Sequence, residues 1–336
     1  MTCLPVRLAH LCSALICAGT VSIASAKTIV VGPDRELKLP SAAALLAGDG
    51  DTVVIDPGEY FDCAVWRANH LTIEGSGENV VITDKTCEGK ALFIISGNDI
   101  TIRNLTFARA RVPDGNGAGI RAEGINLRVE HSRFVNNESG ILADASPSNS
   151  LTIVSSEFIG NGRCGDGRCA HALSVEQIVL LHVENCKFTA TKQGHHIVSR
   201  AVRSELTGNE IADGPEGNSS YLVDIPNGDS LAMVNNVLEK GPKSSNPGTA
   251  IMLGEEARAP ATGEYVFSGN RFSNDSGAAT IFIRNWTSVT AKLDGNILGG
   301  RTTPVSSDGY FLHQIRVQSA RFVALCKALA RTVLRQ

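Results

Sequence analysis

A repeat of roughly 25 residues runs through most of this chain and restricts its fold more than any other feature. In each repeat a short strand-like stretch, such as residues 127–129 or 151–153, leads into a polar turn and then a large apolar residue. The apolar residue recurs at intervals of 23 to 34 residues, at Phe107, Phe134, Phe158, Phe188, Ile211, Leu238, Phe272 and Leu298. A unit this short cannot bury its own apolar face, so neighbouring units must stack and share one core. The sequence therefore predicts a solenoid.

Composition decides between a helical and a β solenoid. The 336 residues include 33 glycines, the strand-like stretches are rich in β-branched residues, and turns of Asn, Gly, Asp and Ser interrupt the chain every few residues. This pattern suits strands and disfavours helices of about 12 residues. Asparagines at successive turns are expected to stack as an amide ladder. We predict an all-β fold, a right-handed parallel β-helix over residues 51–300, after an N-terminal cap at 27–50 with a short helix at 40–47.

The N-terminal segment has the features of a secretory signal peptide. Arg7 is followed by an apolar run at residues 11–21 and by Ala24-Ser25-Ala26, a small-residue cleavage site. The apolar run is shorter than the ~20 residues that a membrane-spanning helix needs, which makes a single-pass anchor the weaker alternative. We therefore expect residues 1–26 to be removed and the protein to be exported, to the periplasm or outside the cell.

The cysteines that remain after such cleavage would enter an oxidising compartment. Cys63 and Cys87 lie about one coil apart, so stacking can bring them together. Cys164 and Cys169 flank a short glycine-rich loop. We predict these two disulfides, because a zinc site would need a second pair of ligands that the sequence near these cysteines lacks. The two others are expected to be buried free thiols: Cys186 and Cys326.

Residues 53–60 read Val-Val-Ile-Asp-Pro-Gly-Glu-Tyr and enter the first coil. Together with the later Asn-x-Phe coils, this entry resembles the pectate-lyase-like superfamily over about residues 52–300. The resemblance implies the right-handed parallel β-helix. It implies less about activity, because lyases, hydrolases, epimerases and non-enzymatic adhesins share this scaffold.

A second resemblance covers residues 194–201, 219–228 and 241–246. These stretches are similar to a group of bacterial secreted right-handed parallel β-helix repeat-containing proteins, which implies a shared site but no particular reaction. The chain departs from that group at Val198, where a basic residue is common, and at Asp229, where a second glycine is common. Loss of a cation at Val198 weakens the expectation of an anionic sugar ligand.

The second strands of successive coils can be superposed by their spacing. The superposition places five apolar residues in one column, expected to face the core: Leu173, Ile197, Leu222, Ile251 and Ile281. Because side chains alternate along a strand, His196 and Tyr221 are predicted to face outward in adjacent coils, with Arg200 and Glu176 further along the same strip. Three polar residues fall in the inward register: His171, His195 and Asp224.

A base, a phenol and a guanidinium on one strip suit β-elimination or C5 epimerisation of a uronic acid. Arg200 would neutralise the sugar carboxylate, His196 would remove the adjacent proton, and Tyr221 would protonate the leaving oxygen. Hydrolysis would instead need two carboxylates across the scissile bond, and the chain has no adjacent Asp pair. Further residues are candidates for substrate binding: His171, His195, Asp224, Glu176 and Glu255.

Structural explanations for the same residues stay open. His171 and His195 could be turn or core histidines, and Asp224 could organise the turn at residues 226–228. Arg200 could pair with an acid one coil away, which contributes little at a surface. The sequence therefore leaves two functions open. The protein is either an enzyme that acts on a polysaccharide, or a non-catalytic protein that belongs to the cell envelope or binds carbohydrate.

The charge balance excludes some partners. Without the signal peptide the chain has 30 basic and 34 acidic residues, a formal charge of −4, because only one Arg and no acid is removed. Such a balance gives no electrostatic footprint for nucleic acid. We expect a polysaccharide or envelope polymer as partner, with no cofactor and no assigned metal site. Calcium is left open, held by carboxylates such as Asp144, Glu176 and Glu255.

The C-terminal tail, residues 301–336, contains an apolar stripe at three-and-four spacing from Leu312 to Val333, with Arg and Lys opposite. This spacing predicts an amphipathic basic helix of about 25 residues. We expect it to cap the solenoid or cover its outer strip. Contact with a membrane surface or an acidic polymer is the alternative.

Overall fold

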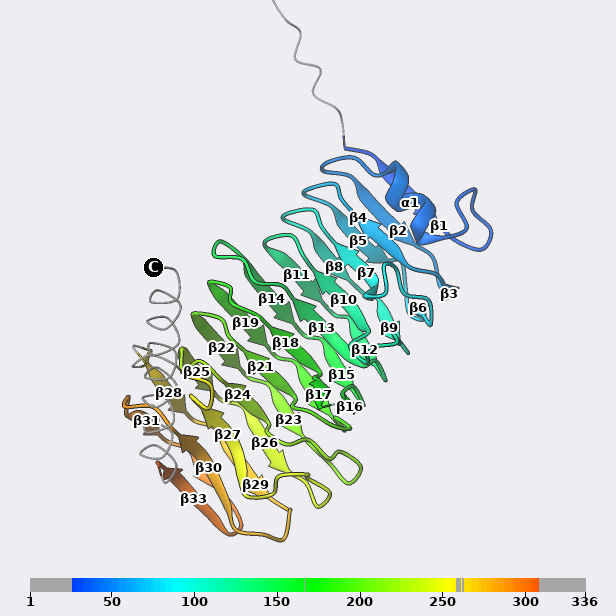
Figure 1. Cartoon of the computed structure of the whole chain (residues 1–336). Coiled ribbons are helices and arrows are strands. Elements are labelled where there is room, and N and C mark those ends of the chain that lie inside the picture. The colour runs from blue at the N-terminus through cyan, green and yellow to red at the C-terminus, as the bar shows by residue number, and fades with distance from the viewer. Residues whose placement is uncertain (1–25, 166, 258–260, 262, 308–336) are drawn as a thin grey trace, which may run out of the picture.

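The chain winds into one solenoid whose faces are three long parallel sheets. Figure 1 shows the solenoid from its first coils in blue to its last in orange. The computed structural model describes residues 26–165, 167–257, 261 and 263–307. Strands of successive coils pair in parallel in each sheet, so the predicted right-handed parallel β-helix is confirmed.

Each of the three sheets takes its strands from successive coils, in order along the solenoid. Sheet A consists of β1 (Thr28–Val31), β2 (Thr52–Ile55), β5 (Thr72–Gly75), β8 (Thr101–Arg103), β11 (Leu127–Glu130), β14 (Ser150–Val154), β19 (Leu180–Glu184), β22 (Arg203–Thr207), β25 (Ser230–Val234), β28 (Tyr265–Ser268) and β31 (Ala291–Asp294). Sheet B consists of β3 (Gly58–Phe61), β6 (Val80–Thr83), β9 (Thr106–Ala108), β12 (Arg133–Val135), β15 (Glu157–Ile159), β20 (Lys187–Thr189), β23 (Glu210–Ala212), β26 (Val237–Lys240), β29 (Arg271–Asn274) and β32 (Ile297–Leu298). Sheet C consists of β4 (Ala64–Trp66), β7 (Ala91–Ile95), β10 (Ala118–Ala122), β13 (Ser139–Ala143), β18 (Leu173–Val175), β21 (Ile197–Ser199), β24 (Val223–Ile225), β27 (Thr249–Leu253), β30 (Thr280–Asn285) and β33 (Thr302–Ser306). A hairpin of β16 (Arg163–Gly165) and β17 (Arg168–Ala170) stands outside the three sheets.

The repeating apolar residues form one continuous column inside sheet B. Residues of successive coils pair directly, from Phe107 with Phe134 to Phe272 with Leu298. The rings of Phe107, Phe134, Phe158 and Phe188 stack with centroids 5.3, 4.7 and 4.4 Å apart. Offset aromatic stacking adds to the free energy gained by burying these rings. The column predicted from the repeat is confirmed.

An amide ladder closes the turns between sheets A and B. The side-chain amide of Asn209 donates to Oδ1 of Asn236 at 3.0 Å, and that of Asn236 donates to Oδ1 of Asn270 at 2.9 Å. Each of these two amides also donates to a backbone carbonyl, so the buried turn loses no hydrogen bond. Gly208 and Gly269, which precede ladder asparagines, have φ of +66°, a conformation that favours glycine or asparagine.

The ends of the solenoid carry the remaining predicted features. Helix α1 (Pro40–Leu46) lies at the N-terminal end, where the sequence predicted a helix at 40–47. The disulfides Cys63–Cys87 and Cys164–Cys169 are both present, as predicted, and Cys186 is a buried free thiol. No helix among the described residues is long and apolar enough to span a membrane. The predicted signal peptide, Cys326 and the predicted C-terminal helix lie outside the described residues, apart from Ala26.

Candidate active site on the outer face of sheet C

The register of sheet C differs in part from the one that spacing predicted. Leu173 pairs with Ile197 as expected, but Ile197 pairs with Val223, and Ile251 pairs with Ile283. The predicted pairing was therefore wrong by one residue at Leu222, where Val223 is the paired residue, and by two residues at Ile281, where Ile283 is the paired residue. The physical reason is a bend at the start of these strands, where two consecutive residues, such as Leu222 and Val223, both face the core. Period-two alternation fails at such a bend.

The prediction that His196 faces outward as a base is wrong for the same reason. Its side chain is completely buried. Its Nδ1 lies 2.8 Å from Oγ1 of Thr191 and its Nε2 lies 3.0 Å from Oδ1 of Asp213. The ammonium group of Lys240 lies 3.8 Å from Oδ2 of Asp213, also fully buried. His196 belongs to this buried polar network and cannot contact a polymer.

The outer face instead carries a stack of His171, His195 and Tyr221. The ring centroids are 4.8 Å apart at each step and the rings are nearly parallel. Backbone N–H groups of His195 and Tyr221 donate to Nδ1 of His171 and His195, both at 3.0 Å. A neutral imidazole whose Nδ1 accepts carries its proton on Nε2. Both histidines, predicted to point inward, therefore present N–H donors on the outer face.

Burial keeps the two outer-face histidines neutral. It lowers the pKa of His171 from 6.5 to about 4, with a smaller contribution from the guanidinium of Arg200. It lowers the pKa of His195 well below 6.5, and the nearby imidazoles and cations act in the same direction. These rings serve as hydrogen-bond donors rather than as cations near neutral pH.

This shift predicts a loss of stability in weak acid. Between pH 6.5 and about 4 the unfolded chain protonates His171 while the folded chain does not, so the free energy of unfolding falls as pH falls through this window. The loss attributable to His171 is at most about 3 kcal/mol. Urea unfolding of wild type and His171→Asn at pH 7 and pH 4.5 checks this. The variant is expected to show a shallower pH dependence, and the exposed His131→Asn the wild-type dependence; identical slopes in all three proteins would contradict it.

Asp224 lies in the outward column of sheet C, between Val198 and Met252, although the sequence placed it inward beside Ser199. Its side chain is 9% exposed and its Oδ2 lies 3.9 Å from Nε2 of His195. Its Oδ1 is buried and has no hydrogen-bond partner within the part of the chain that the structure describes. Burial raises its pKa well above the usual range, and the carboxylates of the 255–256 pair raise it further.

Arg200 and Tyr221 flank this carboxyl group. The guanidinium of Arg200 lies 3.6 Å from Glu176 and 2.9 Å from Glu256. The hydroxyl of Tyr221 donates to Glu255 at 3.3 Å, and burial raises the pKa of the phenol, which keeps it protonated. Sequence spacing did not select Glu256, although its adjacency to Glu255 was a usable signal.

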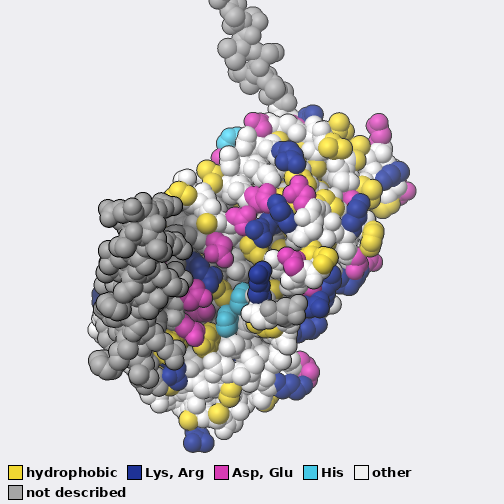
Figure 2. Space-filling model, in the orientation of Figure 1, with side chains coloured by type: hydrophobic (Ala, Val, Ile, Leu, Met, Phe, Trp, Pro, Cys, Tyr) yellow, Lys and Arg dark blue, Asp and Glu magenta, His cyan; other side chains and the backbone are white. Residues whose placement is uncertain are grey.

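All the predicted site residues except His196 thus lie together on one surface, which we call the site strip. Figure 2 shows histidine side chains on this side of the molecule, with acidic and basic side chains around them. The strip is defined by His171, Glu176, His195, Arg200, Tyr221, Asp224, Glu255 and Glu256. Among the described residues, no cluster of three or more His, Cys, Asp or Glu could hold a metal ion. Asp144, considered for calcium, pairs with Arg121.

Comparisons with known proteins agree on the fold. Residues 39–171 match the family model described as a right handed beta helix region. An alginate lyase from Paenibacillus sp. str. FPU-7 is 15% identical with a TM-score of 0.57, covering 83% of this chain and 99% of that one. The A-module of the mannuronan C-5 epimerase AlgE4 from Azotobacter vinelandii is 15% identical with a TM-score of 0.47, covering 79% and 91%. No curated protein matches the chain. The predicted likeness to pectate-lyase-like proteins is confirmed as a likeness of fold.

Proposed function

We propose that this protein binds an acidic polysaccharide along the outer face of sheet C and removes the proton beside a uronate carboxyl group, as a lyase or a C5 epimerase. The observation that carries this proposal is the state of the Asp224 carboxyl group. This group is nearly buried, one of its oxygens has no hydrogen-bond partner among the described residues, and its pKa is raised. Groups perturbed in this way are concentrated at catalytic sites.

Asp224 takes the role that the sequence assigned to His196. A carboxyl group with a raised pKa is a stronger base when it is ionised, because its conjugate acid holds the proton more tightly. The Nε2–H of His195 faces the same carboxyl group at 3.9 Å, within reach of small side-chain movements. The neutral rings of the stack offer further N–H donors to sugar hydroxyls.

Arg200 and Tyr221 complete the chemistry. Arg200 pairs with the sugar carboxylate in place of Glu256 and stabilises the negative charge that develops there when the C5 proton leaves. In β-elimination the electron pair from the C5–H bond forms the C4–C5 double bond, the C4–O bond breaks, and the Tyr221 hydroxyl protonates the leaving oxygen. In epimerisation the C4–O bond stays intact and Tyr221 returns a proton to the other face of C5.

Two features support this substrate class and this location in the cell. The alginate lyase that shares the fold at a TM-score of 0.57 acts, by its title, on a polymer of this class. The two disulfides suit an oxidising compartment, in keeping with export to the periplasm or beyond and with an envelope polymer as partner.

Binding without turnover is the second candidate function. It is favoured by the ion pairs of Arg200 with Glu176 and Glu256, which a sugar carboxylate has to replace. A binding protein would keep these pairs and contact the polymer through the ring stack instead.

One experiment separates the two candidates. The purified protein is incubated in D₂O with alginate, pectate and glycosaminoglycans, and the ultraviolet absorbance of unsaturated uronates is followed together with deuterium at C5 by NMR. A lyase produces absorbance, and an epimerase produces deuterium at C5 without chain cleavage. If no uronan produces either the absorbance or deuterium at C5, the catalytic proposal is contradicted. Binding measured on the same polymers would then support the second candidate.

Arg200→Gln is expected to reduce kcat/KM on the uronan that is turned over by about ten- to a hundred-fold, the value of one charged hydrogen-bonded contact. The matched control is Arg203→Gln, which removes an exposed arginine whose ion-pair partner, Glu205, lies outside the site strip. Initial rates over a range of polymer concentrations give kcat/KM for wild type, Arg200→Gln and Arg203→Gln. Equal losses in both variants would show that Arg200 has no specific role.

A further inference from the structure

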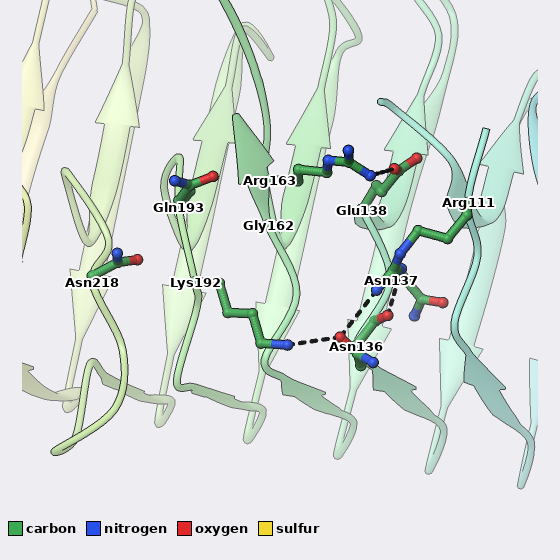
Figure 3. A pocket seen from close by; sticks show the side chains of 9 residues that line it. All are labelled: Arg111, Asn136, Asn137, Glu138, Gly162, Arg163, Lys192, Gln193 and Asn218. Carbon is green, nitrogen blue, oxygen red and sulfur yellow. Dashed lines mark hydrogen bonds and ion pairs between the residues drawn. The ribbon is translucent and has the colours of Figure 1, made fainter. Parts of the chain in front are cut away.

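A concave site lies beside the site strip, at the turns that connect sheets B and C. It is a cavity of about 390 Å³, and Figure 3 shows the side chains that line it. The lining residues follow β9, β12, β15, β20 and β23, five neighbouring strands of sheet B. The cavity therefore crosses successive coils and runs along the solenoid axis.

The lining of this cavity is positively charged. Arg111, Arg163 and Lys192 carry three positive charges and Glu138 carries one negative charge, which leaves a formal charge of +2. Glu138 is already committed, because its Oε2 accepts the backbone N–H groups of Val112 at 3.0 Å and of a glycine at 2.8 Å, and its Oε1 pairs with Arg163 at 2.7 Å. This carboxylate orients Arg163 and offers little repulsion to an incoming anion.

The other two cations are held in place by neutral groups. Arg111 donates to the carbonyl oxygen of Asn136 at 2.7 Å and to its Oδ1 at 3.1 Å, and Lys192 donates to the same Oδ1 at 2.8 Å, as Figure 3 shows. Neither forms an ion pair with any described residue of this chain. Two cations converging on one amide oxygen are preorganised for an anion, which would bind without first displacing a carboxylate.

The cavity also offers an acceptor for a hydroxyl group. Oδ1 of Asn218 is buried and has no hydrogen-bond partner among the described residues. A buried polar atom left in this state costs free energy that a ligand donor recovers. An anion alone would satisfy the cations and not this acceptor, whereas a sugar unit that carries both an anionic group and hydroxyls satisfies both.

The cavity and the site strip are adjacent along the chain. Gln193 lines the cavity two residues before His195, and Asn218 lines it three residues before Tyr221. The disulfide hairpin joins Arg163 to His171, and its Cys164 N–H donates to Oε1 of Gln193 at 2.7 Å. The hairpin is thus fixed at the boundary between the two sites.

We infer that this cavity is a subsite for an anionic sugar unit of the same polymer whose reacting unit lies on the site strip, an inference that rests on the proposed function for the identity of the polymer. The site strip is rich in carboxyl groups and gives an acidic polymer few favourable contacts. The +2 cavity supplies the missing electrostatic attraction a short distance away.

Equilibrium binding tests this subsite without depending on turnover. Titration calorimetry is performed with a uronan oligosaccharide, a neutral oligosaccharide of equal length and a sulfated but uronate-free oligosaccharide. The double variant Arg111→Gln/Lys192→Gln is expected to bind the uronan about ten- to a hundred-fold more weakly than wild type. Arg133→Gln, which removes an exposed cation of β12 outside the cavity, is expected to bind as wild type does.

Unchanged uronan affinity in the double variant overturns the subsite. Tighter binding of the sulfated oligosaccharide, lost in the double variant, overturns the assignment of a uronate carboxyl group to it. The proposed function fails separately, through absence of product absorbance and of deuterium at C5 in the wild-type protein. An intact melting temperature of the double variant shows that any loss of affinity comes from the two side chains.

Discussion

Replacing Asp224 with Asn is expected to reduce turnover of the uronan by about a hundred- to ten-thousand-fold, the usual contribution of a general base. Asn has the same shape but cannot accept the C5 proton. Because burial raises the pKa of Asp224, the ionised base is depleted as pH falls through that raised pKa, and wild-type activity falls with it. Initial rates as a function of pH, for wild type and Asp224→Asn, measure both effects.

The control for this prediction is Asp99→Asn, an exposed carboxylate that pairs with His70 away from the site strip. It is expected to keep the wild-type rate and pH profile. Asp224→Asn is expected to keep the wild-type melting temperature, because no described residue donates a hydrogen bond to its Oδ1. Full turnover by a folded Asp224→Asn protein would exclude this residue as the base.

Replacing Asp213 with Ala is expected to lower the free energy of unfolding by about 3–5 kcal/mol, the effect of breaking a buried ion pair. Asp213 accepts from Ser219 and contacts both His196 and Lys240, whose side chains are fully buried. Its pKa is lowered to about 2 by these partners, while burial lowers the pKa of Lys240 to about 8. Without Asp213 the ammonium group retains, among the residues that the structure describes, only the carbonyl oxygens of Ser219 and Ser220. Urea unfolding followed by circular dichroism measures the loss.

A second variant tests the cause of this destabilisation. Asp213→Ala/Lys240→Met removes both buried charges, so it is expected to be more stable than Asp213→Ala alone. A double variant that is less stable than the single one would show that packing, and not an uncompensated charge, is responsible. A loss below about 1 kcal/mol in Asp213→Ala would contradict the role given to this network.

The core of the fold was predictable because sheet B repeats one simple feature. A single apolar residue, from Phe107 to Leu298, occupies the same inward position in each coil, and the turn before it is polar. The two disulfides were predictable for a similar reason, since Cys63 and Cys87 lie about one coil apart and Cys164 and Cys169 flank one loop. These features depend only on the period of the repeat or, for Cys164 and Cys169, on closeness in the sequence.

The site was harder to predict because sheet C departs from strict alternation. At the bend that begins such a strand, two consecutive residues face the core, for example Leu222 and Val223, so the alternation that spacing assumed does not hold across the bend. His196 therefore points inward and His195 outward, the opposite of the prediction. The cationic cavity could not be predicted either, because its residues come from turns of different coils and converge only through stacking.

A crystal structure of the Asp224→Asn protein with a bound uronan oligosaccharide tests the central claim most directly. We predict a sugar carboxylate within hydrogen-bonding distance of the Arg200 guanidinium, with the side chain of residue 224 facing C5 of the same sugar and the Tyr221 hydroxyl near its O4. A polymer bound elsewhere, with Arg200 still paired to Glu176 and Glu256, would contradict it.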